Sequence, residues 1–202
     1  MSGPHNPRPA TPLDGGPSLD SHVCEIVKNC HFHLRALQYI RPSLTHEVTN
    51  TMACSVVAVR IDYCNSLLAV ISEKNLDKLQ RVQNQAAHIV CNVGRRQSSS
   101  CDLLAVLHWL LVRQRIDYRL ATLCFKVPKL HQPSNLSAAV QLYLPQRTLR
   151  STTKELLIIP PQKTVPGSRR FSVAAPTVWN ELPITLRSFD NFKTFKTGLK
   201  TH

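Results

Sequence analysis

The chain has 202 residues, which is long enough to bury a hydrophobic core without help from disulfides or a structural metal. It carries 25 Lys and Arg against 12 Asp and Glu, and a net charge of +13 suggests an anionic partner, with nucleic acid the first candidate. No stretch is apolar enough to cross a bilayer, and the first residues have neither the positively charged start nor the apolar core of a signal peptide. We therefore expect an intracellular protein of the nucleus or cytoplasm, with no membrane partner, whose seven cysteines are reduced.

The first half of the chain predicts helices separated by short breaks. Residues 1–18 are rich in proline and glycine and are predicted to be a disordered leader. The apolar residues that follow recur at steps of three and four, which predicts an amphipathic helix that ends at Arg41. Thr45 is predicted to be the N-cap of a second helix. A third helix is expected to end near Gly94, which could provide a left-handed C-cap.

The second half of the chain is more mixed. Ser100 is predicted to cap a short helix, and the longer helix that follows is expected to end at Pro128. Short extended runs at residues 156–159 and 171–173 suggest strands that can pair as a small hairpin. Two helices are expected to close the chain, the last of them capped by Ser188.

The predicted fold is mainly α. A thumb-like helical bundle is expected at residues 19–130, followed at residues 131–202 by a small basic α module that has room for a short β hairpin. Positive charge is concentrated towards the end of the chain, because residues 147–202 hold ten Lys or Arg against three acids. These residues therefore hold +7 of the net charge of +13, which is over half of it.

No catalytic constellation is evident in the sequence. A polymerase needs carboxylates that converge on two magnesium ions, and no two acidic residues are adjacent in this chain. Glu73 and Asp77 share a helical face but alternate with lysines, which is typical of surface ion pairs. We also find no Gly-rich phosphate loop and no recognisable setting for a hydrolytic nucleophile. The chain is therefore predicted not to be an enzyme and to need no cofactor.

One set of residues contains cysteines and histidines of the kind that bind zinc, but their spacing in the sequence is not that of a zinc site. The set is Cys24, Cys30, His31 and His33. These residues lie within a predicted helix and point in different directions, whereas structural zinc is usually held by close pairs of ligands on turns. We therefore interpret them as core cysteines and partly exposed histidines, and no metal site is predicted.

Basic residues recur at helical spacing in three predicted helices, and such rows can follow a phosphate backbone. The candidate nucleic-acid-binding residues are Lys74, Lys78 and Arg81 in the third helix, Arg115, Arg119 and Lys126 in the fifth, Lys193, Lys196 and Lys200 in the last, and Arg147, Arg150, Arg169 and Arg170 in loops. The alternative for any single row is an ordinary solvated helix face. Trp109, Trp179 and Phe171 lie in apolar runs, and we assign them to the core and not to base stacking.

Six strings occur in one order: CEIVKNCHFHLRAL (24–37), DYCNSLL (62–68), LDKLQRVQNQAAHIV (76–90), LHWLLVRQRIDY (107–118), FSVAAPTVWNELP (171–183) and SFDNFKTFKTGLKTH (188–202). Together they resemble the region after the palm in LINE-type (non-LTR) retrotransposon reverse transcriptases, which are RNA-directed DNA polymerases. The resemblance implies a helical thumb and a C-terminal extension that help to hold template RNA and primed DNA. The palm with its catalytic aspartates and the endonuclease would both be missing. The chain departs from the family at Leu111, where relatives usually have proline, and at Pro128, which interrupts a helix that normally continues.

The leading hypothesis is therefore a transposon-derived fragment of a reverse transcriptase that binds RNA or an RNA/DNA hybrid without reading its sequence. A second hypothesis is a protein-interaction or structural module, in which the charge serves solubility. A third is that the chain acts only when the rest of a reverse transcriptase is supplied in trans. The fourth is a translated genomic remnant with no selected function.

Overall fold

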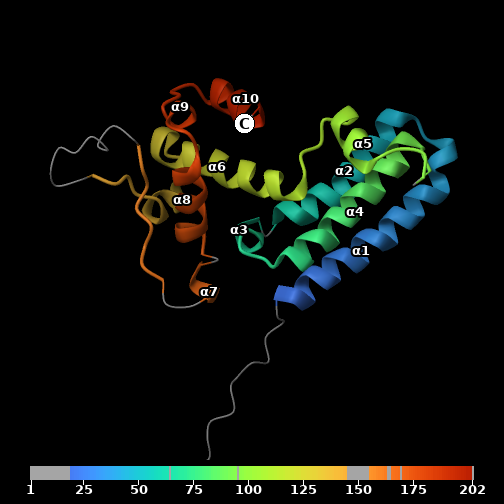
Figure 1. Ribbon diagram of the computed structural model, residues 1–202, viewed down its shortest axis with the longest axis horizontal. Coiled ribbons are helices and arrows are strands. Elements are labelled where there is room, and N and C mark those ends of the chain that lie inside the picture. The colour runs from blue at the N-terminus through green and yellow to red at the C-terminus, as the bar shows by residue number, and fades with distance from the viewer. Residues whose placement is uncertain are drawn as a thin grey trace, which may run out of the picture.

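A computed structural model describes residues 19–63, 65–94, 96–144, 155–162, 165–168 and 170–201. This part of the chain is mainly helical, as predicted, and Figure 1 shows its two parts, a group of long helices and a group of shorter ones linked by α6. The predicted leader at residues 1–18 lies outside the described residues. None of the described helices combines the length and apolar character needed to cross a membrane.

The helices are named as in Figure 1. They are α1 (Leu19–Ile40), α2 (His46–Tyr63), α3 (Asn65–Leu68), α4 (Glu73–Cys91), α5 (Ser100–Val106), α6 (Val112–Leu130), α7 (Val165–Ser168), α8 (Phe171–Glu181), α9 (Ile184–Arg187) and α10 (Phe192–Thr201). Two short 3₁₀ helices lie at Arg41–Ser43 and Ser134–Ala139.

Helices α1, α2 and α4 form a three-helix body that is joined by apolar faces. Each helix buries a stripe of apolar residues at steps of three and four, among them Leu34, Ile61 and Leu79. Helices α1 and α4 run parallel, because Asp20 contacts Asn75 near their starts and the His31 ring nitrogen lies 2.7 Å from Gln85 Oε1 further along. Helix α2 packs against both and runs in the opposite direction to α1.

Two of the predicted helix ends in this body are confirmed and one is wrong. Helix α1 ends at Ile40, directly before Arg41, and Thr45 Oγ1 accepts a hydrogen bond from the Val48 amide in the first turn of α2. Helix α4 ends with Asn92, not Gly94, in the left-handed conformation, at φ 54°. Asparagine tolerates this conformation better than most residues, so it could take the position that the prediction reserved for glycine.

Two predictions around the next helices are also corrected. The side chain that caps α5 is Ser99, whose hydroxyl accepts a hydrogen bond from the Cys101 amide, and Ser100 is the first helical residue. Helix α6 does not end at Pro128 but continues to Leu130, and His131 adopts the left-handed conformation after it. Because Pro128 lies in the final turn, its missing N–H costs one hydrogen bond, while the buried side chains of Phe125 and Val127 hold this end against the core.

The extended segments pair differently from the prediction. Residues 171–173 are the first turn of α8, and Leu157 instead forms an antiparallel bridge with Leu142. Within the described ranges this isolated bridge is the only β pairing. At the end of the chain the capping residue is Asn191 and not Ser188, because Asn191 Oδ1 accepts hydrogen bonds from two amides in the first turn of α10.

The C-terminal module is built around aromatic rings. Phe195 of α10 is fully buried, and its ring stacks on Phe125 of α6 with a centroid separation of 4.6 Å. Trp179 of α8 lies 5.7 Å from the same Phe195 ring. Helix α6 therefore packs against α8 and α10, although it also contacts α3 and α4 of the preceding part. One hydrophobic core runs through both parts of the molecule.

Candidate nucleic-acid interface

The last helix presents a basic face next to the aromatic cluster. Asn191 caps α10, and Phe195 anchors its inner side. Lys193, Lys196 and Lys200 are spaced by three and four residues, so they follow one side of the helix. Lys193 and Lys200 are exposed, and Lys196 is half-buried. The row predicted from the sequence therefore lies on an accessible helix face.

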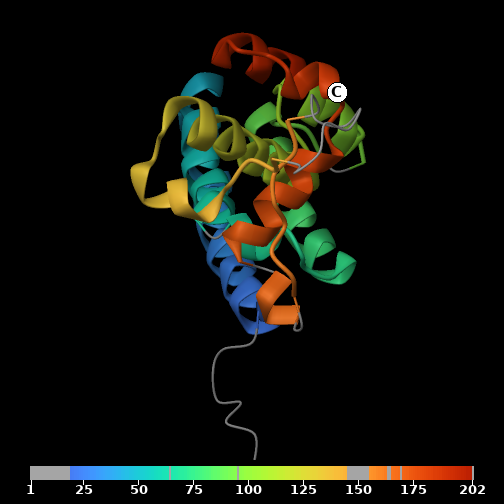
Figure 2. The ribbon, with the colours of Figure 1, turned by 90° about the vertical axis from the view of Figure 1, so that its left-hand side faces the viewer.

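A lysine from a second helix joins this row. Lys126 of α6 places its ammonium 4.8 Å from the centre of the Phe192 ring, and Lys196 of α10 lies 5.5 Å from the same ring. Such cation–π contacts hold an ammonium group near an aromatic face without neutralising its charge. Figure 2 shows α10 lying over the end of α6, which explains how residues from the two helices meet. We call Lys126, Lys193, Lys196 and Lys200 the α10 surface.

The four lysines of the α10 surface have no carboxylate partner among the described residues. The nearby acid Asp190 pairs instead with Lys129, which also donates to the Phe189 carbonyl at 2.6 Å. Uncompensated ammonium groups attract phosphate oxygens and release counterions when they bind a nucleic acid. The α10 surface therefore presents four uncompensated positive charges of the kind that attract phosphate groups.

The row on α6 divides between two roles. Lys126 belongs to the α10 surface, whereas Arg115 and Arg119 both form ion pairs with Asp62 of α2. Arg115 donates from two nitrogens to the two carboxylate oxygens of Asp62, at 2.9 and 2.8 Å. This bidentate pair links α6 to the three-helix body. Arg115 and Arg119 are thus already occupied by a carboxylate within the chain.

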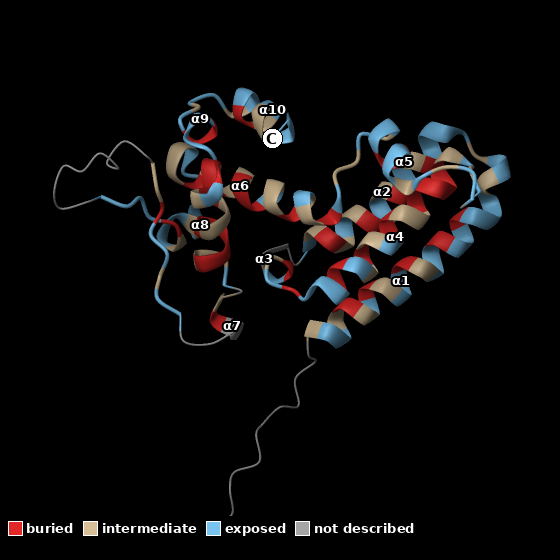
Figure 3. Ribbon diagram, viewed as in Figure 1, coloured by how far each residue is buried: buried red, intermediate tan, exposed pale blue. Residues whose placement is uncertain are grey.

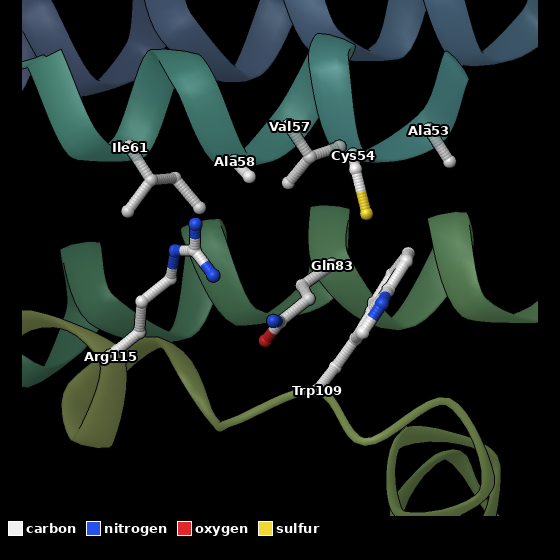
Figure 4. A pocket seen from close by; sticks show the side chains of 8 residues that line it. All are labelled: Ala53, Cys54, Val57, Ala58, Ile61, Gln83, Trp109 and Arg115. Atoms are coloured by element: carbon white, nitrogen blue, oxygen red, sulfur yellow. The ribbon is translucent and has the colours of Figure 1, made fainter. Parts of the chain in front are cut away.

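Arg115 also lines a small cavity between α2, α4 and the segment before α6 (Figure 4). The cavity measures about 120 Å³ and is lined mainly by apolar side chains, including Ile61 and Trp109. Burial raises the pKa of the Cys54 thiol in its wall, and the positive charge of Arg115 opposes this rise. Gln83 closes another part of the wall by donating to the Leu110 carbonyl at 2.9 Å. The cavity belongs to the junction of the two parts and not to the charged surface.

The row on α4 is more open. Lys74 and Arg81 are exposed and have no ion-pair partner among the described residues. Lys78 is half-buried at the seam with α1, where its ammonium lies 3.0 Å from Asn75 Oδ1 and 3.4 Å from Cys24 Sγ. The α4 row thus provides two exposed cations, Lys74 and Arg81. It lies on the three-helix body, whereas the α10 surface lies on the C-terminal module.

The remaining candidates are less informative. Arg147, Arg150 and Arg169 lie outside the described residues. Arg170 is exposed at the N-cap of α8. Trp179 is buried and donates its indole N–H to the Glu155 carbonyl at 2.8 Å, and both Trp109 and Phe171 are half-buried against the core. These three aromatic residues are therefore part of the packed interior, as their apolar surroundings suggested.

Two exposed cations of α1, Lys28 and Arg35, were missed by the sequence prediction. They are seven residues apart, so they lie on one helix face. A search for basic pairs at this spacing in every predicted helix would have found them.

Within the described ranges, no three His, Cys, Asp or Glu side chains gather where they could hold a metal ion, and Cys24, Cys30 and the other described cysteines are free thiols. Comparisons with family models, with curated proteins and with solved structures found no match to this chain.

Proposed function

We propose that the chain is a non-catalytic nucleic-acid-binding module, derived from the C-terminal part of a LINE-type reverse transcriptase, that binds RNA or an RNA/DNA hybrid without sequence readout. The observation that carries the proposal is the α10 surface, where four lysines from two helices are accessible and have no described carboxylate partner. The net charge of +13 is consistent with this function. The resemblance of six sequence strings to that family supports the choice of RNA or hybrid as ligand.

The proposal predicts that binding depends on the charge of α10 and not on the identity of its side chains. Reversing Lys193, Lys196 and Lys200 to Glu should weaken binding to a labelled RNA/DNA hybrid by at least about tenfold at moderate salt, because three phosphate contacts become repulsive. Fluorescence anisotropy measures this change. The matched control replaces the same three lysines with Arg, which keeps the charge and should keep the affinity.

The outcomes separate the proposal from its alternatives. Equal affinity of the Glu and Arg variants would contradict the role of the α10 surface, provided that circular dichroism shows both to be folded. No binding by the unmodified chain would favour a protein-interaction module or an inert remnant. Primer extension by the isolated chain, dependent on a divalent metal and retained through purification, would contradict the non-catalytic part of the proposal.

A further inference from the structure

The outer face of α1 carries cations and aromatic rings in alternation. Lys28, Phe32, Arg35 and Tyr39 follow one another at steps of four, three and four residues, which places them on one side of the helix. All four are exposed: Phe32 retains 67% of its surface and Tyr39 88%. Figure 3 shows exposed segments that alternate with buried ones along α1, as expected of a helix with one free side. We call these four residues the α1 stripe.

Packing among the described residues leaves both rings largely exposed, although the Phe32 ring meets the neighbouring His33 ring edge-on at 5.4 Å. The buried side of α1 is formed by other residues, such as Cys30, Leu34 and Leu37, and these already provide its contacts with the core. An aromatic ring that stays in water loses the free energy it would gain on burial. Two such rings on one face, each flanked by a cation, therefore form a surface that is suited to a ligand with both flat apolar groups and negative charge.

The neighbouring helix extends the positive charge of this face. Helices α1 and α4 are parallel and paired at an offset of 54 residues, so Arg81 of α4 lies level with the turn of α1 that carries Lys28. The helical repeat places the exposed Arg81 on the flank of α4 that borders the same side of the seam as the α1 stripe. Beyond Glu25 in α1 and Asp77 in α4, neither helix contains an acidic residue. Because the two helices are parallel, the parts of α1 and α4 that contain no acidic residue lie side by side.

We propose that the α1 stripe is a binding platform for single-stranded nucleic acid, in which Phe32 and Tyr39 stack on bases while Lys28, Arg35 and Arg81 contact phosphates. The rise of the helix separates Phe32 from Tyr39 by about 10 Å along its axis, so the two rings can accept different bases of one strand. Stacking on aromatic rings beside a basic surface is a sequence-tolerant way to bind single strands. A duplex keeps its bases stacked on one another and gains only the phosphate contacts.

This inference rests on the proposed binding of nucleic acid but concerns another surface, so the two can be tested separately. The probes are a fluorescein-labelled oligothymidine of about twelve nucleotides and a duplex of the same length. The Phe32→Ala/Tyr39→Ala double variant should bind the single strand about tenfold more weakly or worse, and the duplex with nearly unchanged affinity. Its salt dependence should equal that of the unmodified chain, because no phosphate contact is removed.

Two controls accompany the double variant. Tyr63→Ala removes an equally exposed tyrosine, 87% exposed on α2, and should leave single-strand binding unchanged. Phe32→Tyr/Tyr39→Phe keeps both rings and should retain the affinity. Circular dichroism checks the fold, which exposed substitutions of this kind should not disturb. A 5-iodouracil in the oligonucleotide should form a photo-crosslink to the peptide that contains Phe32 or Tyr39.

The inference is overturned if the Phe32→Ala/Tyr39→Ala variant binds the single strand as tightly as the unmodified chain, or if single-strand and duplex affinities fall equally. Absence of single-strand binding by the unmodified chain would also overturn it. If reversal of the α10 lysines weakens hybrid binding while the double variant changes nothing, the proposed function stands and only the α1 platform fails.

Discussion

The three-helix body and the C-terminal module bury their apolar surface with different kinds of side chain. In the body, α1, α2 and α4 are long enough to bury continuous aliphatic stripes, and polar pairs such as His31 with Gln85 fix the register of the parallel helices. In the module, α8 and α10 are shorter, and the Trp179 and Phe195 rings, together with Phe125 of α6, are the largest fully buried side chains of the described residues. Short helices can be held in place when a few large side chains are shared among them.

The two parts also differ in what happens to their positive charge. At the junction, Asp62 binds Arg115 and Arg119, so these cations stabilise the contact between α2 and α6. On α10 the lysines have no carboxylate partner in the described part of the chain. Basic residues at the same helical spacing can therefore serve folding in one place and remain available to a ligand in another.

The largest expected effect lies in the aromatic cluster. Phe195→Ala should lower the free energy of unfolding by about 3–5 kcal/mol, because it removes a fully buried ring that contacts two helices. Urea denaturation followed by circular dichroism measures the change. Phe32→Ala is the matched control, since this ring is 67% exposed, and it should cost about 0.5 kcal/mol or less. Similar losses in both variants would contradict the central role given to the cluster.

Asp62→Asn should have the next largest effect, because Asp62 accepts hydrogen bonds from both Arg115 and Arg119. We expect a loss of about 1–2 kcal/mol in the free energy of unfolding, reduced from the value for a buried pair because the site is partly solvated. A double-mutant cycle with Arg115→Met isolates the coupling between α2 and α6. If the two substitutions are additive, the ion pair does not join the two parts of the molecule.

The long helices of the body could be predicted from the sequence because their apolar periodicity is strong and their ends carry clear breaks. The helix end at Arg41 and the cap at Thr45 are examples. Two of the errors lie where tertiary contacts outweigh local preference: Pro128 is retained within α6, and residues 171–173 are helical because α8 packs on α6. The others concern the choice between neighbouring capping residues, such as Ser99 and Ser100. The ion pairs of Asp62 could not be predicted either, because helical periodicity does not relate residues more than fifty positions apart in the sequence.

Asp117 allows a prediction about pH. It belongs to α6, on the side that faces Glu181 of α8. Burial raises the pKa of its carboxyl, the positive charge of Arg113 lowers this pKa and the negative charge of Glu181 raises it, with a net rise. A raised pKa in the folded state means that the ionised form destabilises the fold, and this penalty grows as pH rises through the unfolded-state value towards the folded-state value. Asp117→Asn should therefore raise the melting temperature at neutral pH.

The control for Asp117→Asn is a series of melting curves at decreasing pH. The advantage of the variant over the unmodified chain should shrink as the pH falls, because Asp117 becomes protonated in both the folded and the unfolded state. A pH-independent difference would mean that the amide changes packing and that the charge of Asp117 is of no consequence.

The smallest expected effect concerns the end of α4. Asn92 is in the left-handed conformation at φ 54°, so Asn92→Gly should change stability by only a few tenths of a kcal/mol, whereas Asn92→Ala should cost about 1 kcal/mol. Thermal unfolding compares the two variants. Equal stability of the Gly and Ala variants would contradict the assignment of this residue as the C-cap. The sequence contains both Asn92 and Gly94, and the general preference for glycine at a left-handed C-cap led to the wrong prediction.

If the lysines of the α10 surface bind phosphates, binding of nucleic acid by the unmodified chain must depend strongly on salt. Anisotropy titrations with a labelled RNA/DNA hybrid at several salt concentrations give the slope of log affinity against log salt. We expect a slope that corresponds to about five or more released counterions. A flat response would contradict this expectation and would mean that the positive charge of the chain does not bind nucleic acid.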